Sequence, residues 1–118
     1  MTREFVYTRT FFNNWKAVGL NDDDLARFET MLLENPKMGA VIQGTGRARK
    51  VRFAYSGEGK SGSVRVIYAD FEIGEKICGL TVYTKSEKDN LTAAEKRNIK
   101  NILEILEIYY DKQVGKEV

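Results

Sequence analysis

The middle of the chain carries two runs whose apolar and polar residues are arranged as in neighbouring β-strands. Residues 49–55 alternate, with apolar side chains at every second position and the basic residues Lys50 and Arg52 between them. Residues 64–71 are apolar at almost every position, which is typical of a central strand that is buried on both faces. Arg65, at the start of this second run, is a conspicuous polar exception. A basic side chain in such a strand suggests a functional role.

A third strand is predicted over residues 77–85, and the alternation places Tyr83 and Lys85 on one of its faces. Residues 56–63 are so rich in glycine and serine that they predict a flexible hairpin connection between the first two runs. Residues 72–75 predict a tight turn before the third run. The pattern therefore indicates a three-strand meander.

Helical spacing flanks this meander on both sides. Thr10 is a possible N-cap for an aromatic-rich helix that ends at Gly19. Asn21 begins a second helix with a capping-box-like pattern, and its apolar stripe ends at the pair Asn35-Pro36. Thr92 opens the best-signalled helix, with a capping box followed by a long amphipathic stripe.

A short strand over residues 4–8 completes the element order strand, helix, helix, three strands, helix. This order predicts an α+β fold in which an antiparallel sheet has its helices packed on one face. We expect residues 1–118 to form a single domain, since no linker-like segment divides them. The tail from Gln113 onward has nothing to bury and is expected to fray.

Composition removes several classes of function. The chain of 118 residues contains no histidine and a single cysteine, Cys78, so an internal disulfide is excluded and a zinc site is not expected. Acid–base chemistry near neutral pH would have to use carboxylates, tyrosines or lysines. No apolar run has transmembrane length and no signal-peptide pattern begins the chain, which predicts a cytoplasmic protein with no membrane contact.

Charge changes the picture more than composition does. The segment from Thr45 to Arg65 has one acid, Glu58, and six basic residues, Arg47, Arg49, Lys50, Arg52, Lys60 and Arg65, although the net charge of the whole chain is only +2. Residues 22–34 hold offsetting acids around Arg27. Such a cluster on a sheet suits the binding of a phosphate backbone, but it is equally typical of a solvated strand that avoids edge pairing. The pattern alone leaves both interpretations open.

Two runs resemble a known family more specifically. The run NPKMGAVIQGTGRARKVRFAYSGEGKSGSVRVIYADF, followed by LTVYTKSEKDNLTAAEK, is similar to the RelE/HigB toxins of bacterial type II toxin–antitoxin systems, and most similar to the HigB branch. This resemblance implies the RelE-like fold and a ribosome-dependent endoribonuclease that cuts messenger RNA in the ribosomal A site without a metal or other cofactor. It also implies a HigA- or RelB-like antitoxin as partner, with operator DNA reached only through that antitoxin.

The resemblance also identifies candidate residues. A basic strand pair corresponds to Lys50 and Arg52, a strand-opening arginine to Arg65, a Y-x-K pattern to Tyr83 and Lys85, and a turn lysine to Lys60. We therefore predict a catalytic set and a substrate-binding set, which are Arg65, Lys85, Tyr83 and Lys60, and Lys50, Arg52, Arg47 and Arg49. The chain departs from the pattern in several places, because Arg47 replaces a glycine, Thr92 falls where some members have a tyrosine, and the histidines of some HigB proteins are absent.

The assignment of proton-transfer roles stays open at this point. Arginine is always protonated, so Arg52 and Arg65 are best interpreted as phosphate clamps. The candidates for proton transfer are then Lys50, Lys60, Lys85 and Tyr83, with the turn acids Glu58 and Glu87 as further possibilities. Two alternatives of other classes also stay open: a ParE-like toxin of the same fold that targets DNA gyrase, and a non-catalytic RNA-binding module.

Overall fold

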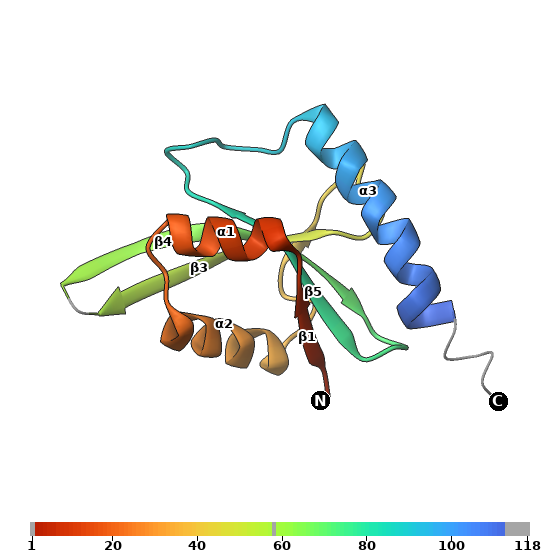
Figure 1. Ribbon diagram of the computed structural model, residues 1–118, viewed down its shortest axis with the longest axis horizontal. Coiled ribbons are helices and arrows are strands. Elements are labelled where there is room, and N and C mark those ends of the chain that lie inside the picture. Colours follow the sequence, from red (N-terminus) through yellow and green to blue (C-terminus); the bar gives the residue numbers. More distant parts are fainter. Residues whose placement is uncertain (1, 58, 113–118) are drawn as a thin grey trace.

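The computed structural model describes residues 2–57 and 59–112, although the side chains of residues 57, 60 and 112 are not described. Within this part of the chain, a five-stranded sheet with the strand order β1-β5-β4-β3-β2 is combined with three α-helices (Figure 1). The elements are β1 (Glu4–Tyr7), α1 (Arg9–Ala17), α2 (Asp22–Glu34), β2 (Ala40–Val41), β3 (Arg49–Gly57), β4 (Lys60–Phe71), β5 (Lys76–Tyr83), α3 (Ala93–Glu107) and a π-helical turn (Ile108–Lys112). The predicted α+β class and the order of the predicted elements are confirmed.

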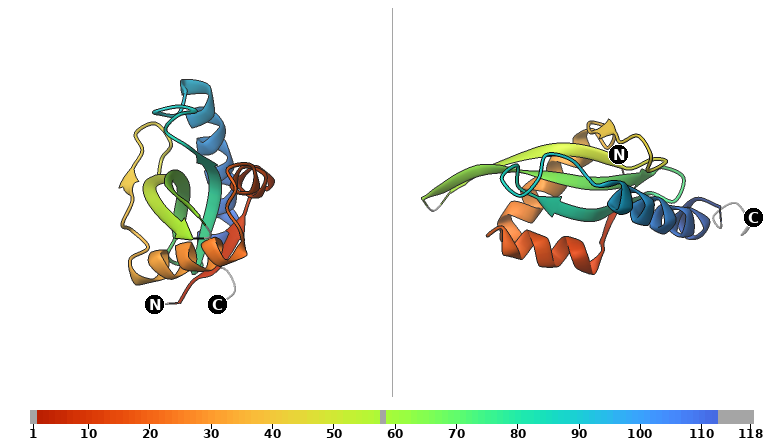
Figure 2. Two further views of the ribbon diagram at one scale, coloured as in Figure 1. Left: turned by 90° about the vertical axis from the view of Figure 1, so that its left-hand side faces the viewer. Right: turned by 90° about the horizontal axis from the view of Figure 1, so that it is seen from above.

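The helices cover both faces of the sheet, not one as predicted (Figure 2). Phe11 and Phe28, from α1 and α2, are fully buried in one core together with Val66 of β4. On the opposite face, Leu103 of α3 is buried in a second core with Ile67 of β4. The physical reason lies in β4, since a strand that is apolar at successive positions needs a cover on each side.

The sheet is also mixed, whereas an antiparallel sheet was predicted. β1 pairs in parallel with β5, from Glu4 opposite Lys76 to Tyr7 opposite Gly79. Two helices separate β1 from the meander, so β1 does not belong to a hairpin and takes the outer edge beside β5. At the other edge, the short strand β2 pairs with the start of β3.

Tertiary contacts also shift element boundaries. α1 begins after Thr8, two residues before the position expected from Thr10, because the Thr8 hydroxyl accepts from the amide of Phe11 and donates to the carbonyl of Leu80 at 2.7 Å. β3 and β4 extend over most of the predicted hairpin loop, since backbone pairing there does not require apolar side chains. Glu58, in this turn, lies outside the described residues, as does the tail from residue 113 onward.

The capping boxes predicted for α2 and α3 are confirmed. The side chain of Asn21 accepts from the backbone amide of Asp24, and the Asp24 carboxylate accepts in return from the Asn21 amide. Thr92 and Glu95 exchange the same two hydrogen bonds at the start of α3. Local hydrogen bonds thus fix the residues at which α2 and α3 begin.

Candidate nucleic-acid interface

Three side chains form a row across the central strands. Arg52 of β3 is the direct cross-strand partner of Arg65 of β4, and Arg65 is in turn the partner of Tyr83 at the end of β5. Successive residues of a strand point to opposite faces, so this row shares the face of Ile67, which α3 covers. Arg65 is two residues before Ile67 on this face, so the row lies next to the part of the sheet that α3 covers. We call Arg52, Arg65 and Tyr83, together with Lys50, the basic row.

A β-bulge brings Tyr83 into this row. Tyr68 pairs with Gly79, but Ile67 pairs with Thr81, so β5 has one extra residue at this point. An unbroken register would have continued in single steps from Gly79 and placed Tyr83 on the opposite face. The bulge therefore re-aims the side chains of β5 that follow it, as bulges next to functional sites often do.

The cations of the basic row differ in their surroundings. Arg52 is exposed, whereas Arg65 is half-buried and its guanidinium lies 3.4 Å from the Ser63 hydroxyl. Lys50, opposite Ile67 and therefore on the same face, donates from its ammonium group to the Asn90 side-chain oxygen at 3.3 Å. Together these groups place three positive charges on neighbouring strands, an arrangement that suits a polyanion.

Tyr83 is buried, with only 2% of its surface exposed. Its hydroxyl has no hydrogen-bond partner among the residues that the structure describes. Burial raises the pKa of Tyr83, and the nearby charge of Arg65 offsets this only in part, while Glu95 adds to it. The phenol is therefore enclosed in this structure, and the proton-transfer role of Tyr83 stays a prediction.

The segment between β5 and α3 lies against the basic row. Lys85 is exposed in this segment, beyond the end of β5, and so does not lie on a strand face with Tyr83 as predicted. The ammonium of Lys88 lies 5.4 Å from the centre of the Tyr83 ring and forms an ion pair with Glu95 of α3. This ion pair, together with the capping bond from Thr92, lowers the pKa of Glu95. Glu95 is therefore an anion under ordinary conditions.

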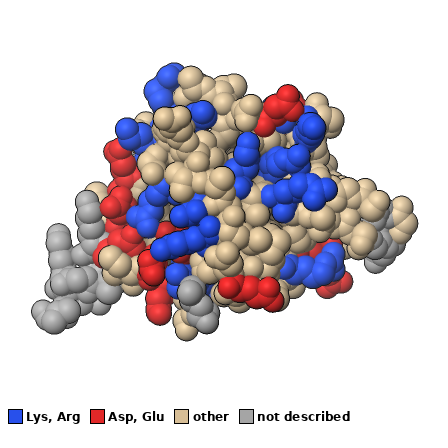
Figure 3. All heavy atoms as spheres, turned by 180° about the vertical axis from the view of Figure 1, so that it is seen from behind, with Lys and Arg blue, Asp and Glu red and all other residues tan. Residues whose placement is uncertain are grey.

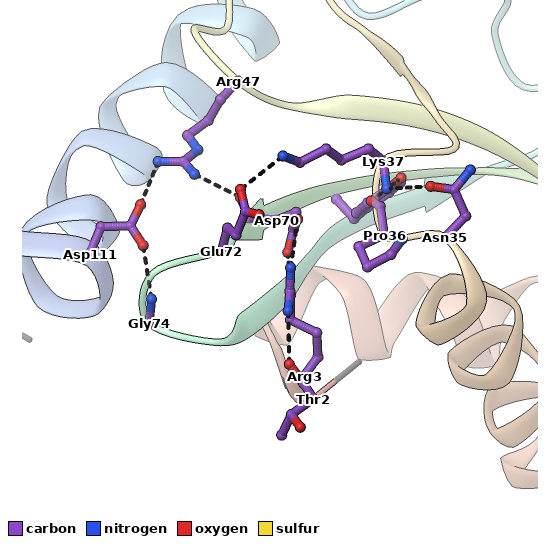
Figure 4. Close-up of polar contacts among 11 residues, drawn as sticks. Thr2, Arg3, Asn35, Pro36, Lys37, Arg47, Asp70, Glu72, Gly74 and Asp111 are labelled. Atoms are coloured by element: carbon purple, nitrogen blue, oxygen red, sulfur yellow. Dashed lines mark hydrogen bonds and ion pairs between the residues drawn. The ribbon is translucent and has the colours of Figure 1, made fainter.

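Two predicted substrate-binding arginines lie apart from the basic row. Arg47 donates to the Asp111 carboxylate at 2.8 Å and to the carbonyl of Asp70 at 2.7 Å (Figure 4). Its guanidinium also stacks over the Phe71 ring. It thus fastens the C-terminal turn to the sheet. Arg49 is three residues from Arg52 on the same strand and faces the other side, where it donates to backbone carbonyls at 2.7 and 3.1 Å. Both guanidiniums hold the fold together.

Lys60 stands at the first position of β4, near the hairpin end, and its side chain is outside the described set. Seen from behind, lysine and arginine side chains gather in patches on either side of the middle of the molecule, and the visible acids lie mainly toward the edges (Figure 3). The acidic helix α2 packs on the sheet face opposite to the basic row. The uneven charge distribution along the sequence therefore becomes an uneven distribution across the sheet.

Other kinds of site find less support. No three histidine, cysteine, aspartate or glutamate side chains in the described ranges are close enough together to hold a metal ion. None of the helices that the structure describes has the length and apolarity needed to cross a bilayer. The candidate site is therefore the basic row and the segment beside it.

The fold and this site define a small α+β protein whose central strands display a cluster of cations on one face. A family model described as the RelE toxin of the RelE/RelB toxin–antitoxin system matches residues 4–117. The chain belongs to this family, and is thus a RelE toxin of a toxin–antitoxin system.

Two solved structures are similar to this chain. A double mutant of the E. coli toxin RelE in the free state, with two arginines changed to alanine, gives a TM-score of 0.52 at 14% identity, covering 75% of this chain and 88% of that one. The intact E. coli RelBE toxin–antitoxin complex also matches, with a TM-score of 0.49, 12% identity, and coverage of 71% and 96%. The first of these likenesses supports the RelE-like architecture described above.

Sequence reasoning missed Lys88 and the role of its partner Glu95. The capping box identified Glu95 as a helix-start residue, but nothing in the spacing indicated that its second carboxylate oxygen would hold a lysine. Lys88 lies in a segment with no regular period, where position along the chain does not predict direction in space. The one signal in the sequence that could have indicated this pair was the position of Lys88, a basic residue shortly before the capping residue Glu95.

Proposed function

We propose that this toxin is a ribosome-dependent endoribonuclease, an mRNA interferase that cuts messenger RNA in the ribosomal A site and so stops translation. The observation that supports this most is the basic row, in which Arg52 and Arg65 stand side by side on one face with Lys50 next to them. Two guanidiniums on one face can donate charge-assisted hydrogen bonds to the oxygens of a phosphodiester. The membership of the RelE family supports the same proposal.

The chemistry assigned to the site is attack of an RNA 2′-oxygen on the adjacent phosphorus. The 2′-hydroxyl gives its proton to a general base as the new 2′-O–P bond forms a cyclic phosphate. The P–O5′ bond breaks, and the 5′-oxygen leaves with a proton from a general acid. Arg52 and Arg65 stabilise the additional negative charge on the phosphorane. Because the Tyr83 hydroxyl is enclosed, the lysines Lys50, Lys60 and Lys85 are the groups to which we assign proton transfer. No step in this scheme uses a metal ion.

The requirement for a ribosome follows from geometry. In-line attack needs the 2′-oxygen, phosphorus and 5′-oxygen to be aligned, and a flexible single strand is seldom aligned by itself. Orientation of reacting groups accounts for a large share of such a barrier. We propose that ribosomal RNA supplies the alignment and that the toxin supplies charge and proton transfer. The cytoplasm is then the compartment in which it acts.

The partner proposed to silence this activity is an antitoxin of the HigA or RelB type, which would also be the toxin's only link to operator DNA. Acidic groups on it near the basic row would accelerate association more than they tighten the final complex. The run GTGRARK, with its GTG followed by basic residues, supports assignment to the HigB-like branch. We further propose that residues 1–118 act as one domain.

Two other functions predict different behaviour. A ParE-like toxin would inhibit DNA gyrase and would not need the basic row. A non-catalytic RNA-binding module would use the row but would leave the message intact. The basic row favours RNA over gyrase, and sequencing of RNA ends separates cleavage from simple binding.

The test is an in vitro translation reaction in which new RNA ends are sequenced on stalled ribosomes. The wild-type toxin should generate ends at the A-site codon, and Arg65→Ala should lower the cleavage rate by about 100-fold or more. Arg97→Ala is the control, because it removes one exposed arginine that is not part of the basic row. Full cleavage by a folded Arg65→Ala protein would refute the assignment. Gyrase inhibition without RNA cleavage would instead favour the ParE-like alternative.

A further inference from the structure

The segment between β5 and α3 has two attachments beside the basic row. At one, the ammonium of Lys50 reaches the Asn90 side chain at 3.3 Å. At the other, Lys88 pairs with Glu95. The two attachments hold the segment against the row from β3 on one side and from α3 on the other.

Lys88 is a cation directly adjacent to the row. Its ammonium lies 5.4 Å from the Tyr83 ring centre, and Tyr83 is the cross-strand partner of Arg65. About a third of the Lys88 side chain is exposed, so its ammonium can still meet a ligand. The Lys88 ammonium thus lies over the Tyr83 ring in a cation–π contact, while the Tyr83 hydroxyl stays enclosed.

The position of Lys88 is set by Glu95. One carboxylate oxygen of Glu95 accepts from the backbone amide of Thr92 at 2.8 Å, which fixes the carboxylate as part of the helix cap. The other oxygen is bound by the Lys88 ammonium. A flexible lysine is therefore held by a group that belongs to a rigid helix start.

We propose that Lys88 contacts a phosphate of the bound RNA, as a further cation of the site, and that Glu95 is its positioning residue. This inference rests on the proposed function, since it assumes that RNA lies across the basic row. The phosphate-binding cations would then come from β3, β4 and the segment after β5. Tyr83 would hold one of them, Lys88, through the contact with its ring.

A purely structural role for the ion pair is the competing explanation, and the chain offers a matched control for it. Lys76 pairs with Glu4 at 3.0 Å, and its ammonium lies 5.9 Å from the Tyr110 ring. It therefore makes the same two kinds of contact as Lys88, but at the opposite end of β5. A change from lysine to methionine keeps most of the apolar stem and removes only the charge.

The first measurement is the salt dependence of binding to ribosomes whose mRNA carries 2′-O-methyl groups in the A site, which block cleavage. Each lost phosphate contact with a single strand lowers the slope of log affinity against log salt by about 0.7. We expect this loss for Lys88→Met, no loss for Lys76→Met, and the wild-type slope for Lys88→Arg. Equal slopes for the two methionine variants would overturn the phosphate contact.

The second measurement is the single-turnover cleavage rate on unmodified mRNA. Glu95→Gln preserves the helix cap and leaves Lys88 unpositioned, so its rate should fall by about tenfold or more. Because Glu95 acts through Lys88, adding Glu95→Gln to Lys88→Met should cause no further loss. A full rate for Glu95→Gln overturns the positioning role. A wild type that binds without cleaving would refute the proposed nuclease while leaving the slope result intact, and a wild type that does not bind would overturn both.

Discussion

Arg52 and Arg65 are direct cross-strand partners on β3 and β4, so two like charges stand side by side on one face of the sheet. Like charges in this position destabilise a sheet, and a fold selected for stability alone would not place them there. We therefore expect Arg52→Ala to leave the free energy of unfolding unchanged or raise it by up to about 1 kcal/mol. The same change should slow RNA cleavage by about 100-fold, as expected for loss of a preorganised charge. Urea unfolding and the cleavage assay, with Arg97→Ala beside them, separate the two effects.

The buried Tyr83 hydroxyl leads to a second prediction. Since it has no partner among the described residues, Tyr83→Phe should not lower the free energy of unfolding, and cleavage should continue. Tyr68→Phe is the contrasting variant, because the Tyr68 hydroxyl donates to the carbonyl of Pro36 and accepts from the amide of Gly39. Loss of the Tyr68 hydroxyl should lower the free energy of unfolding by about 1–3 kcal/mol. Abolished cleavage in a stable Tyr83→Phe protein would show that the phenol becomes accessible on the ribosome.

Arg47 should behave as a structural residue. Arg47→Ala removes an ion pair with Asp111, a bond to a backbone carbonyl and a ring contact, and leaves a mostly buried carboxylate without its cation. We expect a loss of about 1–3 kcal/mol in the free energy of unfolding, with faster hydrogen exchange in the C-terminal turn. Per folded molecule, the cleavage rate should be unchanged. A slowed rate at full stability would return Arg47 to the substrate-binding set.

Cys78 gives a prediction about alkaline pH. Burial raises the pKa of its thiol to about 11, whereas an unfolded cysteine titrates near 8.5. The folded state therefore keeps its proton after the unfolded state has lost it, so stability is complete below about pH 8.5 and falls as the pH rises toward 11. The total loss is about 3 kcal/mol. Comparison of unfolding curves for wild type and Cys78→Ala between pH 7 and 11 should isolate this loss, and parallel curves would contradict it.

Patterns among neighbouring residues predicted the features that depend on neighbouring residues, such as strand faces and helix starts. The alternation around Lys50 and Arg52 placed both on one strand face, and the capping boxes at Asn21 and Thr92 identified the starts of two helices. The isolated arginine in an apolar run drew attention to Arg65, which the structure places beside Arg52.

What the sequence could not predict depends on contacts between distant segments. The bulge at Thr81 reverses the side-chain direction of Tyr83, and no composition signal marks it. Arg47 and Arg49 look like the other basic residues of their segment, yet carbonyls and a carboxylate from elsewhere in the fold engage them. The same applies to Lys88, whose direction is set by Glu95.

The pairing of β1 with β5 has a consequence for the order of events during synthesis. Residue Glu4 leaves the ribosome early, but its strand partner Lys76 follows only after most of the sheet has been made. Contacts so distant in sequence form late, because the loop between them must first be closed. Tyr83 and Lys88 emerge later still, so the full set of cations assembles after the rest of the sheet. A nascent chain that ends before Lys88 lacks the full set of cations. One that ends before Lys76 also lacks the strand with which β1 pairs.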